Sequence, residues 1–465
     1  MDRRRFLAGG AVAGCGLDPR EPDLARLYAQ TAAIDPAARR PIVAIPGFMG
    51  SRLRLGRDGP FLWGGPGRLS PDPRAPEALR DLALPFDGAT GPTVRVDGVL
   101  RRADAAVLGG TVEQVVYDGM IAALNAGGYA FSRSEAEERA RRGANPGSLE
   151  FPYDWRRDIV DIARDLDAFV ERKAEEVAET RRRLYGWSVA PAEMRFDFVA
   201  HSMGALVLRW WLLHGARQPP EDGPMPAPDW SGARRAACAI FVAPPFLGSA
   251  LALDSLIGGR SPGLLQPWFP PALLGTFPAL HQLAPRARHR RIRIGAADGP
   301  ATEDTFDVAT WARHGWGLLD PAEDARLSVL LPDAPGRAAR AAQAEAHLAR
   351  LLRRAAQVHA ALDRPTPPVG ADLFLVVGTG LDTPATLVIG RDGRTVAMTR
   401  EDGDGAVLRA SALHDEAQGG HASGAARPRT EYRTVLLLPG EHVRLTRNAV
   451  FADNLIYWLL GAPRG

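Results

Sequence analysis

The sequence contains few cysteines, a single lysine and no long apolar run. Its 465 residues include two cysteines, Cys15 and Cys238, so a disulfide framework is excluded. No stretch of 18 unbroken apolar residues occurs, which argues against a membrane-spanning helix. Since Lys173 is the one lysine, nearly all of the 57 basic residues are arginine, and they are spread along the chain. With a net charge of only +3, this spread disfavours nucleic acid as a partner.

The N-terminal segment is similar to a bacterial export signal. Residues 3–7 read RRRFL, which fits the twin-arginine pattern Arg-Arg-x-Phe-Leu, and residues 12–15 read VAGC, which resembles a lipobox. We therefore expect residues 1–15 to be an export and lipoprotein signal and residues 16–40 to be a linker. Lipid on Cys15 would hold the protein in the bacterial cell envelope. The alternative is a basic tail with a chance cysteine.

Strand and helix patterns alternate from residue 41 onward, which predicts an α/β domain over 41–465. Its sheet is expected to be mostly parallel and covered by helices on both faces. Insertions are expected at about 55–110 and 250–345. The patterns predict strands at 41–45, 149–155, 196–200, 238–243, 372–377 and 435–438, and helices at 112–124, 158–184, 340–362 and 447–460, the last with Thr446 as a possible N-cap.

The stretch at 195–208 is the centre of the sequence pattern. It reads RFDFVAHSMGALVL, an apolar strand followed by a sharp turn and a helix, with Ser202 at the turn. Small residues two positions before and after the serine, Ala200 and Gly204, suit a nucleophile elbow, because the tight turn leaves no room for bulk. Alanine replaces the commoner glycine at the first position. Ser202 is therefore the candidate nucleophile, and an ordinary turn serine is the alternative.

A serine nucleophile needs a base and an acid that orients the base. In the α/β-hydrolase order, both follow the serine along the chain, after late strands. Only His442, of ten histidines, lies between a final strand and a final helix. The loop at 401–407 offers Asp404 and Asp402, of which Asp404 is preferred because it precedes Gly-x-Val.

The oxyanion of a tetrahedral intermediate needs backbone N–H donors. The residue after the nucleophile, Met203, supplies one of them. The loop after the strand at 41–45 is expected to supply the other, from the N–H of Phe48, because the stretch at 46–48, Pro-Gly-Phe, fits this role. A plain turn is the alternative for this Pro-Gly pair.

Five further motifs make the chain resemble the lecithin:cholesterol acyltransferase family, which includes lysosomal phospholipases. The most specific is similar to the family's Pro-Tyr-Asp-Trp-Arg motif. Ala200 and Ala406 depart from the family pattern, which favours glycine and threonine there, and paired cysteines are absent. The motifs are FPYDWR at 151–156, IPGFMGS at 45–51, APPFLGS at 243–249, FPALHQLAP at 277–285 and GTGLDTPAT at 378–386.

The resemblance implies an α/β-hydrolase fold and an O-acyltransferase or phospholipase without metal or cofactor. Ser202 would form an acyl-enzyme from a glycerophospholipid, and a lipid alcohol or water would receive the acyl group. A carboxylesterase for smaller esters is the alternative, and a non-catalytic protein of the same fold that binds lipid or a partner is a third.

Two apolar segments are expected to contact lipid. Residues 250–275 carry many large apolar side chains and would form a mobile lid, and the exposed-looking Phe61–Trp63 would form a small membrane-docking element. Tryptophan suits a membrane interface because its ring is apolar and its N–H stays wet. The alternative is that Trp63 and Trp268 belong to the core.

The export hypothesis predicts a mature chain that begins at a lipidated Cys15. Intact-mass measurement of the membrane fraction should show the loss of residues 1–14 and the added mass of a diacylglyceryl group. Cys15→Ser should leave the chain without lipid. A membrane-associated protein that keeps residues 1–14, or carries no lipid mass, would contradict the hypothesis.

Overall fold

The computed structural model describes most of the chain after the N-terminal segment. The signal-like residues, Cys15 and all but the last two residues of the expected linker lie outside the described part. The described residues are 39–66, 70–86, 93–107, 110–115, 117–129, 131, 147–220, 223, 227–261, 266–299, 303–364, 370–415 and 430–461.

A six-stranded sheet forms the centre of the molecule, and every neighbouring pair of its strands is parallel. Apolar side chains alternate between its faces, since Val43 and Ile45 belong to one core cluster and Ile42 and Ala44 to the other. The predicted α/β class with a mostly parallel sheet is confirmed. In spatial order the strands are β14 (Thr434–Pro439), β11 (Asp372–Thr379), β9 (Ala236–Val242), β8 (Phe196–His201), β1 (Ile42–Ile45) and β7 (Ser148–Glu150).

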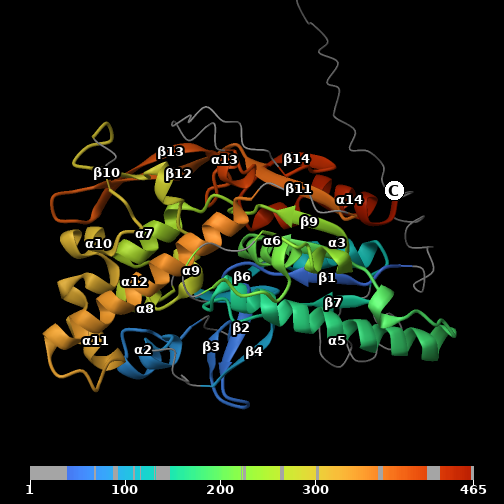
Figure 1. Ribbon diagram of the computed structural model, residues 1–465, viewed down its shortest axis with the longest axis horizontal. Coiled ribbons are helices and arrows are strands. Elements are labelled where there is room, and N and C mark those ends of the chain that lie inside the picture. The colour runs from blue at the N-terminus through green and yellow to red at the C-terminus, as the bar shows by residue number, and fades with distance from the viewer. Residues whose placement is uncertain are drawn as a thin grey trace, which may run out of the picture.

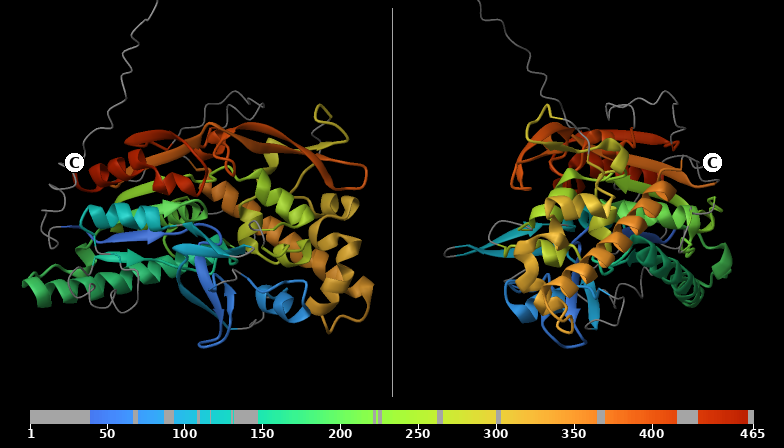
Figure 2. Two further views of the ribbon diagram at one scale, coloured as in Figure 1. Left: turned by 180° about the vertical axis from the view of Figure 1, so that it is seen from behind. Right: turned by 60° about the vertical axis from the view of Figure 1, so that its left-hand side comes forward.

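Helices cover both faces of this sheet (Figures 1 and 2). On one face, α5 (Ile159–Tyr185) and α6 (Met203–His214) contribute the buried side chains. On the other, α3 (Asp118–Ala126) and α14 (Ala449–Ile456) do so. The Asp158 side chain caps α5 by accepting from the Val160 N–H, which agrees with the predicted start of this helix.

The first insertion contains antiparallel strands. The predicted helix at 112–124 is wrong in its first part, because residues 110–115 form a strand and the helix begins at Asp118. The reason is that Thr111, Val112 and Val115 are β-branched and favour a strand over a helix. The strands are β2 (Ser51–Leu55), β3 (Phe61–Trp63) and β4 (Val94–Val99) in one sheet and β5 (Arg102–Val107) and β6 (Gly110–Val115) in a hairpin; α2 (Pro76–Leu82) lies between β3 and β4 in the chain.

The expectation that Phe61–Trp63 is exposed is wrong for its last two residues. Leu62 is 1% and Trp63 is 3% exposed. The Trp63 indole N–H donates to the Met49 carbonyl at 2.7 Å, and its ring packs edge-on against Trp155 at 5.7 Å. Membrane contact by this small sheet stays a prediction, and Trp63 cannot contribute to it as a surface side chain.

The second insertion is largely helical and packs against the first. The long helix expected at 340–362 is present and begins three residues earlier. The short strand β10 (Ile292–Ile294) had no sequence signal, because three residues are too few to show a period. The helices are α7 (Ala250–Gly258), α8 (Pro271–Leu274), α9 (Pro278–Gln282), α10 (Val308–His314), α11 (Asp324–Leu330) and α12 (Arg337–Leu362).

The expected lid segment lies against the core where it is described. In α7, Leu253 and Leu256 are 1% exposed, and Phe269 is fully buried. Trp268 is half-buried, with the Arg326 guanidinium 5.4 Å from its ring centroid. Most of the large apolar side chains described in this segment are therefore buried inside the molecule.

The last part of the chain contains a hairpin, a short helix and the closing helix. The expected cap of the closing helix is wrong. Asn448, and not Thr446, caps α14, because its side chain accepts from the N–H groups of Val450 and Phe451. The Thr446 hydroxyl donates to the Val443 carbonyl instead. The hairpin strands are β12 (Leu381–Ile389) and β13 (Thr395–Gly403), and α13 (Arg409–Ala412) follows them.

None of the described helices is long and apolar enough to cross a bilayer.

Candidate active site

Ser202 lies in a strained turn between β8 and α6. Its backbone φ of 53° and ψ of −126° place it in a region that residues other than glycine rarely occupy. Such strain persists only where the surrounding structure enforces it, and it is common at functional sites. Here the loop that contains Pro46 packs closely against the turn and holds it in place. The approach is so close that a Cβ at Gly204 would lie 2.3 Å from the Pro46 carbonyl oxygen. The fully buried Ala200 precedes the turn.

The structure brings Ser202, His442 and Asp404 together. His442 Nε2 lies 2.9 Å from the Ser202 Oγ, and His442 Nδ1 lies 2.7 Å from the Asp404 Oδ2. The serine hydroxyl therefore donates to the imidazole, whose other nitrogen donates to the carboxylate. The His442 side chain is 13% and that of Asp404 1% exposed, so the chain of hydrogen bonds runs from a cavity wall into the interior.

Asp404 is held as a carboxylate although it is buried. Burial raises the pKa of Asp404, but neighbouring His442 and the N–H groups of Val407 and Ala406 lower it to a net value below the ordinary one. Its Oδ1 accepts from these two N–H groups at 2.7 and 3.0 Å. The acid is therefore charged at neutral pH and can stabilise an imidazolium.

The loop that carries the acid is fixed by its own hydrogen bonds. The Gly405 N–H donates to the Thr383 hydroxyl at 2.8 Å. The His442 N–H donates to the Asp404 carbonyl at 2.9 Å, so acid and base are joined through the backbone as well as through their side chains. Thr383 belongs to the motif at 378–386, which thus helps to position the acid.

Asp402, the alternative acid, is not part of this arrangement. Its carboxylate pairs with Arg409 at 3.1 Å and accepts from the Gly380 N–H at 2.7 Å. Its side chain is 38% exposed. Asp404 and not Asp402 contacts the base.

The two residues expected to form the oxyanion hole flank the serine. A Cβ at Gly47 would lie 2.8 Å from the Ser202 Cβ, so the loop that carries Phe48 lies directly against Ser202. Among the described residues, the N–H groups of Phe48 and Met203 have no hydrogen-bond partner. The Gly47 N–H, in contrast, donates to the Tyr117 hydroxyl at 2.6 Å. The two free N–H groups are therefore those available to an oxyanion.

Residues of the motif at 151–156 form hydrogen bonds with the same loop and support it. The Tyr153 hydroxyl donates to the Pro46 carbonyl at 2.6 Å, and the Trp155 indole N–H donates to the Ser51 carbonyl at 3.1 Å. Arg156 forms a bidentate pair with Asp154 at 2.9 and 2.7 Å. These residues are buried, so the motif acts as scaffold for the loop.

A cavity of about 300 Å³ opens beside the triad. Most of its wall is apolar and comes from the second insertion and from the loop at 46–51. Among the described residues, Arg260 is the one arginine of the wall. The lining residues are Phe48, Met49, Ser202, Pro245, Ser249, Leu251, Ala252, Ser255, Arg260, Phe269, Leu274, Leu280, Leu283, Ala406, Val407 and His442.

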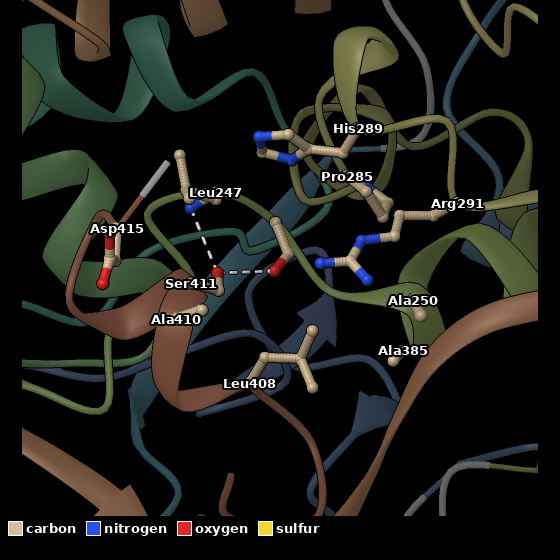
Figure 3. A pocket seen from close by; sticks show the side chains of 11 residues that line it. Leu247, Ala250, Pro285, His289, Arg291, Ala385, Leu408, Ala410, Ser411 and Asp415 are labelled. Atoms are coloured by element: carbon tan, nitrogen blue, oxygen red, sulfur yellow. Dashed lines mark hydrogen bonds between the residues drawn. The ribbon is translucent and has the colours of Figure 1, made fainter. Parts of the chain in front are cut away.

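The turn at 243–249 connects this wall to the acid loop. The Ser249 hydroxyl donates to the Ala406 carbonyl at 2.6 Å. Ser411 accepts from the Leu247 N–H at 3.1 Å and donates to the Gly248 carbonyl at 2.7 Å, as Figure 3 shows. The small pocket around Ser411 has a volume of about 20 Å³, which is room for one water molecule.

Three arginines of the basic run at 286–293 form ion pairs within the protein. Arg286 and Arg288 pair with Asp363 at 3.0 and 2.7 Å, and Arg291 pairs with Glu401 at 2.6 Å.

Over the described residues, no group of three or more His, Cys, Asp and Glu side chains is arranged to hold a metal ion.

Comparison with known proteins bears on the fold alone. No family model and no curated protein matches this sequence. A chain of the solved structure titled "The crystal structure of Tle4-Tli4 complex" is similar over 91% of this chain and 98% of its own length, with a TM-score of 0.53 and 16% sequence identity. This likeness supports the α/β fold with a central parallel sheet described above.

The geometry predicts different outcomes for the two neighbouring acids. Asp404→Asn should lower kcat/KM for a short soluble ester by about 10³- to 10⁴-fold, because the amide can present a hydrogen to His442 Nδ1 and favour the wrong tautomer. Asp402→Asn is the matched control and should stay within about threefold, since Asp402 contacts Arg409 and not the base. Equal losses in the two variants, or a larger loss for Asp402→Asn, would contradict the assignment.

Proposed function

We propose that this protein is a serine-dependent acyl hydrolase or acyltransferase that acts on lipid esters. The observation that carries the proposal is that the hydrogen-bonded Ser202, His442 and Asp404 open onto a cavity with a mostly apolar wall. A polar reaction centre beside an apolar wall suits a substrate that has an ester carbonyl and a hydrocarbon chain.

The first half of the reaction forms an acyl-enzyme. Ser202 Oγ attacks the ester carbonyl carbon while His442 Nε2 takes the serine proton. The oxyanion of the tetrahedral intermediate accepts from the N–H groups of Phe48 and Met203. The intermediate collapses, the C–O bond to the alcohol breaks, and His442 returns the proton to the leaving oxygen. Asp404 stabilises the imidazolium throughout and stays ionised.

In the second half, an acceptor hydroxyl attacks the acyl-enzyme. His442 takes its proton, and the bond to Ser202 Oγ breaks as the proton returns to the serine. Water as the acceptor gives a fatty acid, whereas a lipid alcohol gives a new ester. The outcome depends on which acceptor reaches the carbonyl and on how well water is excluded.

A glycerophospholipid is the proposed acyl donor. Leu251, Phe269, Leu274, Leu280 and Leu283 give the cavity wall the apolar character that an acyl chain requires. The motifs quoted above support a relationship to the lecithin:cholesterol acyltransferase family, which uses such donors. A lipid anchor at Cys15 would keep the enzyme at the membrane surface of the cell envelope, where this donor is found.

Lipid mass spectrometry tests this proposal. The purified protein is incubated with phosphatidylcholine and phosphatidylglycerol vesicles, with and without a long-chain alcohol, beside Ser202→Ala. We expect lysophospholipid with fatty acid, and a wax-type ester where the alcohol is present, with formation at least 10³-fold slower in the variant.

The alternatives give different results. Cleavage of a p-nitrophenyl butyrate probe without any turnover of vesicles would indicate a carboxylesterase for small esters. Failure to turn over either substrate would indicate a non-catalytic protein of this fold. Vesicle turnover at the same rate in Ser202→Ala would contradict the role of the serine.

A further inference from the structure

Two buried residues that the reaction scheme does not use lie directly behind the triad. His201 precedes Ser202 at the end of β8, and Tyr117 immediately precedes α3. Each is only 2% exposed. Their rings pack edge-to-face with centroids 5.5 Å apart, and the His201 ring lies 4.8 Å from the His442 ring.

Their polar atoms form a continuous chain of hydrogen bonds. The Gly47 N–H donates to the Tyr117 hydroxyl oxygen at 2.6 Å, and this hydroxyl lies 3.0 Å from His201 Nδ1. On the other side of the ring, His201 Nε2 lies 3.2 Å from the His442 carbonyl oxygen. The chain therefore runs from the oxyanion loop, through two side chains, to the backbone of the base.

Proton counting allows one arrangement of this chain. The His442 carbonyl can only accept, so His201 Nε2 must carry a hydrogen. In a neutral ring, His201 Nδ1 is then an acceptor, and the Tyr117 hydroxyl must donate to it. This hydroxyl can still accept from the Gly47 N–H, so every group in the chain is satisfied.

The surroundings keep both side chains neutral. Burial lowers the pKa of His201 to about 3, with a further contribution from His442. Burial also raises the pKa of Tyr117 well above its ordinary value. A second cation therefore does not form next to His442 when the base takes a proton.

We propose that Tyr117 and His201 are positioning residues that couple the oxyanion loop to the catalytic base. His201 fixes the backbone carbonyl of His442, whose N–H is already fixed by the Asp404 carbonyl. Tyr117 fixes the Gly47 N–H, which leaves the next N–H, that of Phe48, directed at the oxyanion. The inference rests on the proposed function for its catalytic meaning.

The coupling acts on the chemical step rather than on binding. Neither Tyr117 nor His201 lines the cavity, so substrate affinity does not depend on direct contact with them. A displaced base or N–H donor weakens the interactions made in the transition state, and a shift of about 1 Å can cost about 100-fold in rate. Loss of these hydrogen bonds should therefore lower kcat and leave KM unchanged.

The first test removes the hydroxyl of Tyr117 alone. Tyr117→Phe should lower kcat for a short soluble ester by about 10- to 100-fold with KM within about twofold, and rates are expressed per site titrated with a fluorophosphonate. The matched control is Tyr129→Phe, since Tyr129 lies in the same core cluster and its buried hydroxyl has no partner among the described residues. It should change kcat by less than about twofold.

The second test uses His201 and a conservative rescue. His201→Leu removes both hydrogen bonds and should lower kcat at least as much as Tyr117→Phe does. His201→Gln keeps an amide donor for the His442 carbonyl and should recover about tenfold of that loss. Equal kcat in the Leu and Gln variants, or a fall in melting temperature with an unchanged kcat per titrated site, would overturn the proposal.

A measurement on the resting protein separates this proposal from the proposed function. Nitrogen-15 NMR of labelled imidazoles, assigned with His201→Gln, should show His201 neutral with its hydrogen on Nε2 from pH 5 to 9. Tyr117→Phe should keep the hydrogen on Nε2, because the His442 carbonyl still requires a donor, and should shift the Nδ1 resonance, because Nδ1 loses its hydrogen bond. A hydrogen on Nδ1 in the wild type, or titration in this range, would overturn the coupling. The result needs no substrate, so it stands even if no ester is turned over.

Discussion

The contact between the loop at 46–51 and the turn that carries Ser202 is the constraint on which the site depends. Pro46 and Gly47 lie so close to Gly204 and Ser202 that a single added Cβ would collide at either glycine. The contact holds the strained serine backbone in place and sets the loop that carries Phe48 against it. The first insertion and the motif at 151–156 support the loop from outside, which explains why Trp63 is buried rather than exposed to a membrane.

The parallel sheet brings the remaining groups to this contact. Strands β1, β8, β9, β11 and β14 all end at the same edge, so the residues that follow them meet there although they are far apart in the chain. His442 follows β14, and Asp404 follows the hairpin that continues from β11. The second insertion adds the apolar wall. The polar groups of the site therefore follow the strands at this edge of the sheet. The wall that would receive an acyl chain comes from the insertions.

The sequence was sufficient for the sheet, the elbow and the identity of the groups that meet at Ser202, because each has a local pattern: an apolar run, a small-residue turn or a place after a late strand. It was insufficient where the signal is short or non-local. The strand β10 has only three residues, too few to show a repeat of apolar side chains. The pattern at 110–115 is compatible with both the helical and the strand repeat. Tyr117 has no spacing relation to His201, 84 residues later, so only the fold reveals their contact.

The central claim is that Ser202 is a nucleophile activated by His442, and labelling with a fluorophosphonate measures this directly. Peptide mapping by mass spectrometry should find one adduct per chain, within residues 195–208 and on Ser202. The rate of labelling should fall by about 10³-fold or more in His442→Ala, because the hydroxyl then loses its base. Labelling at another residue, or at an unchanged rate in His442→Ala, would contradict the account.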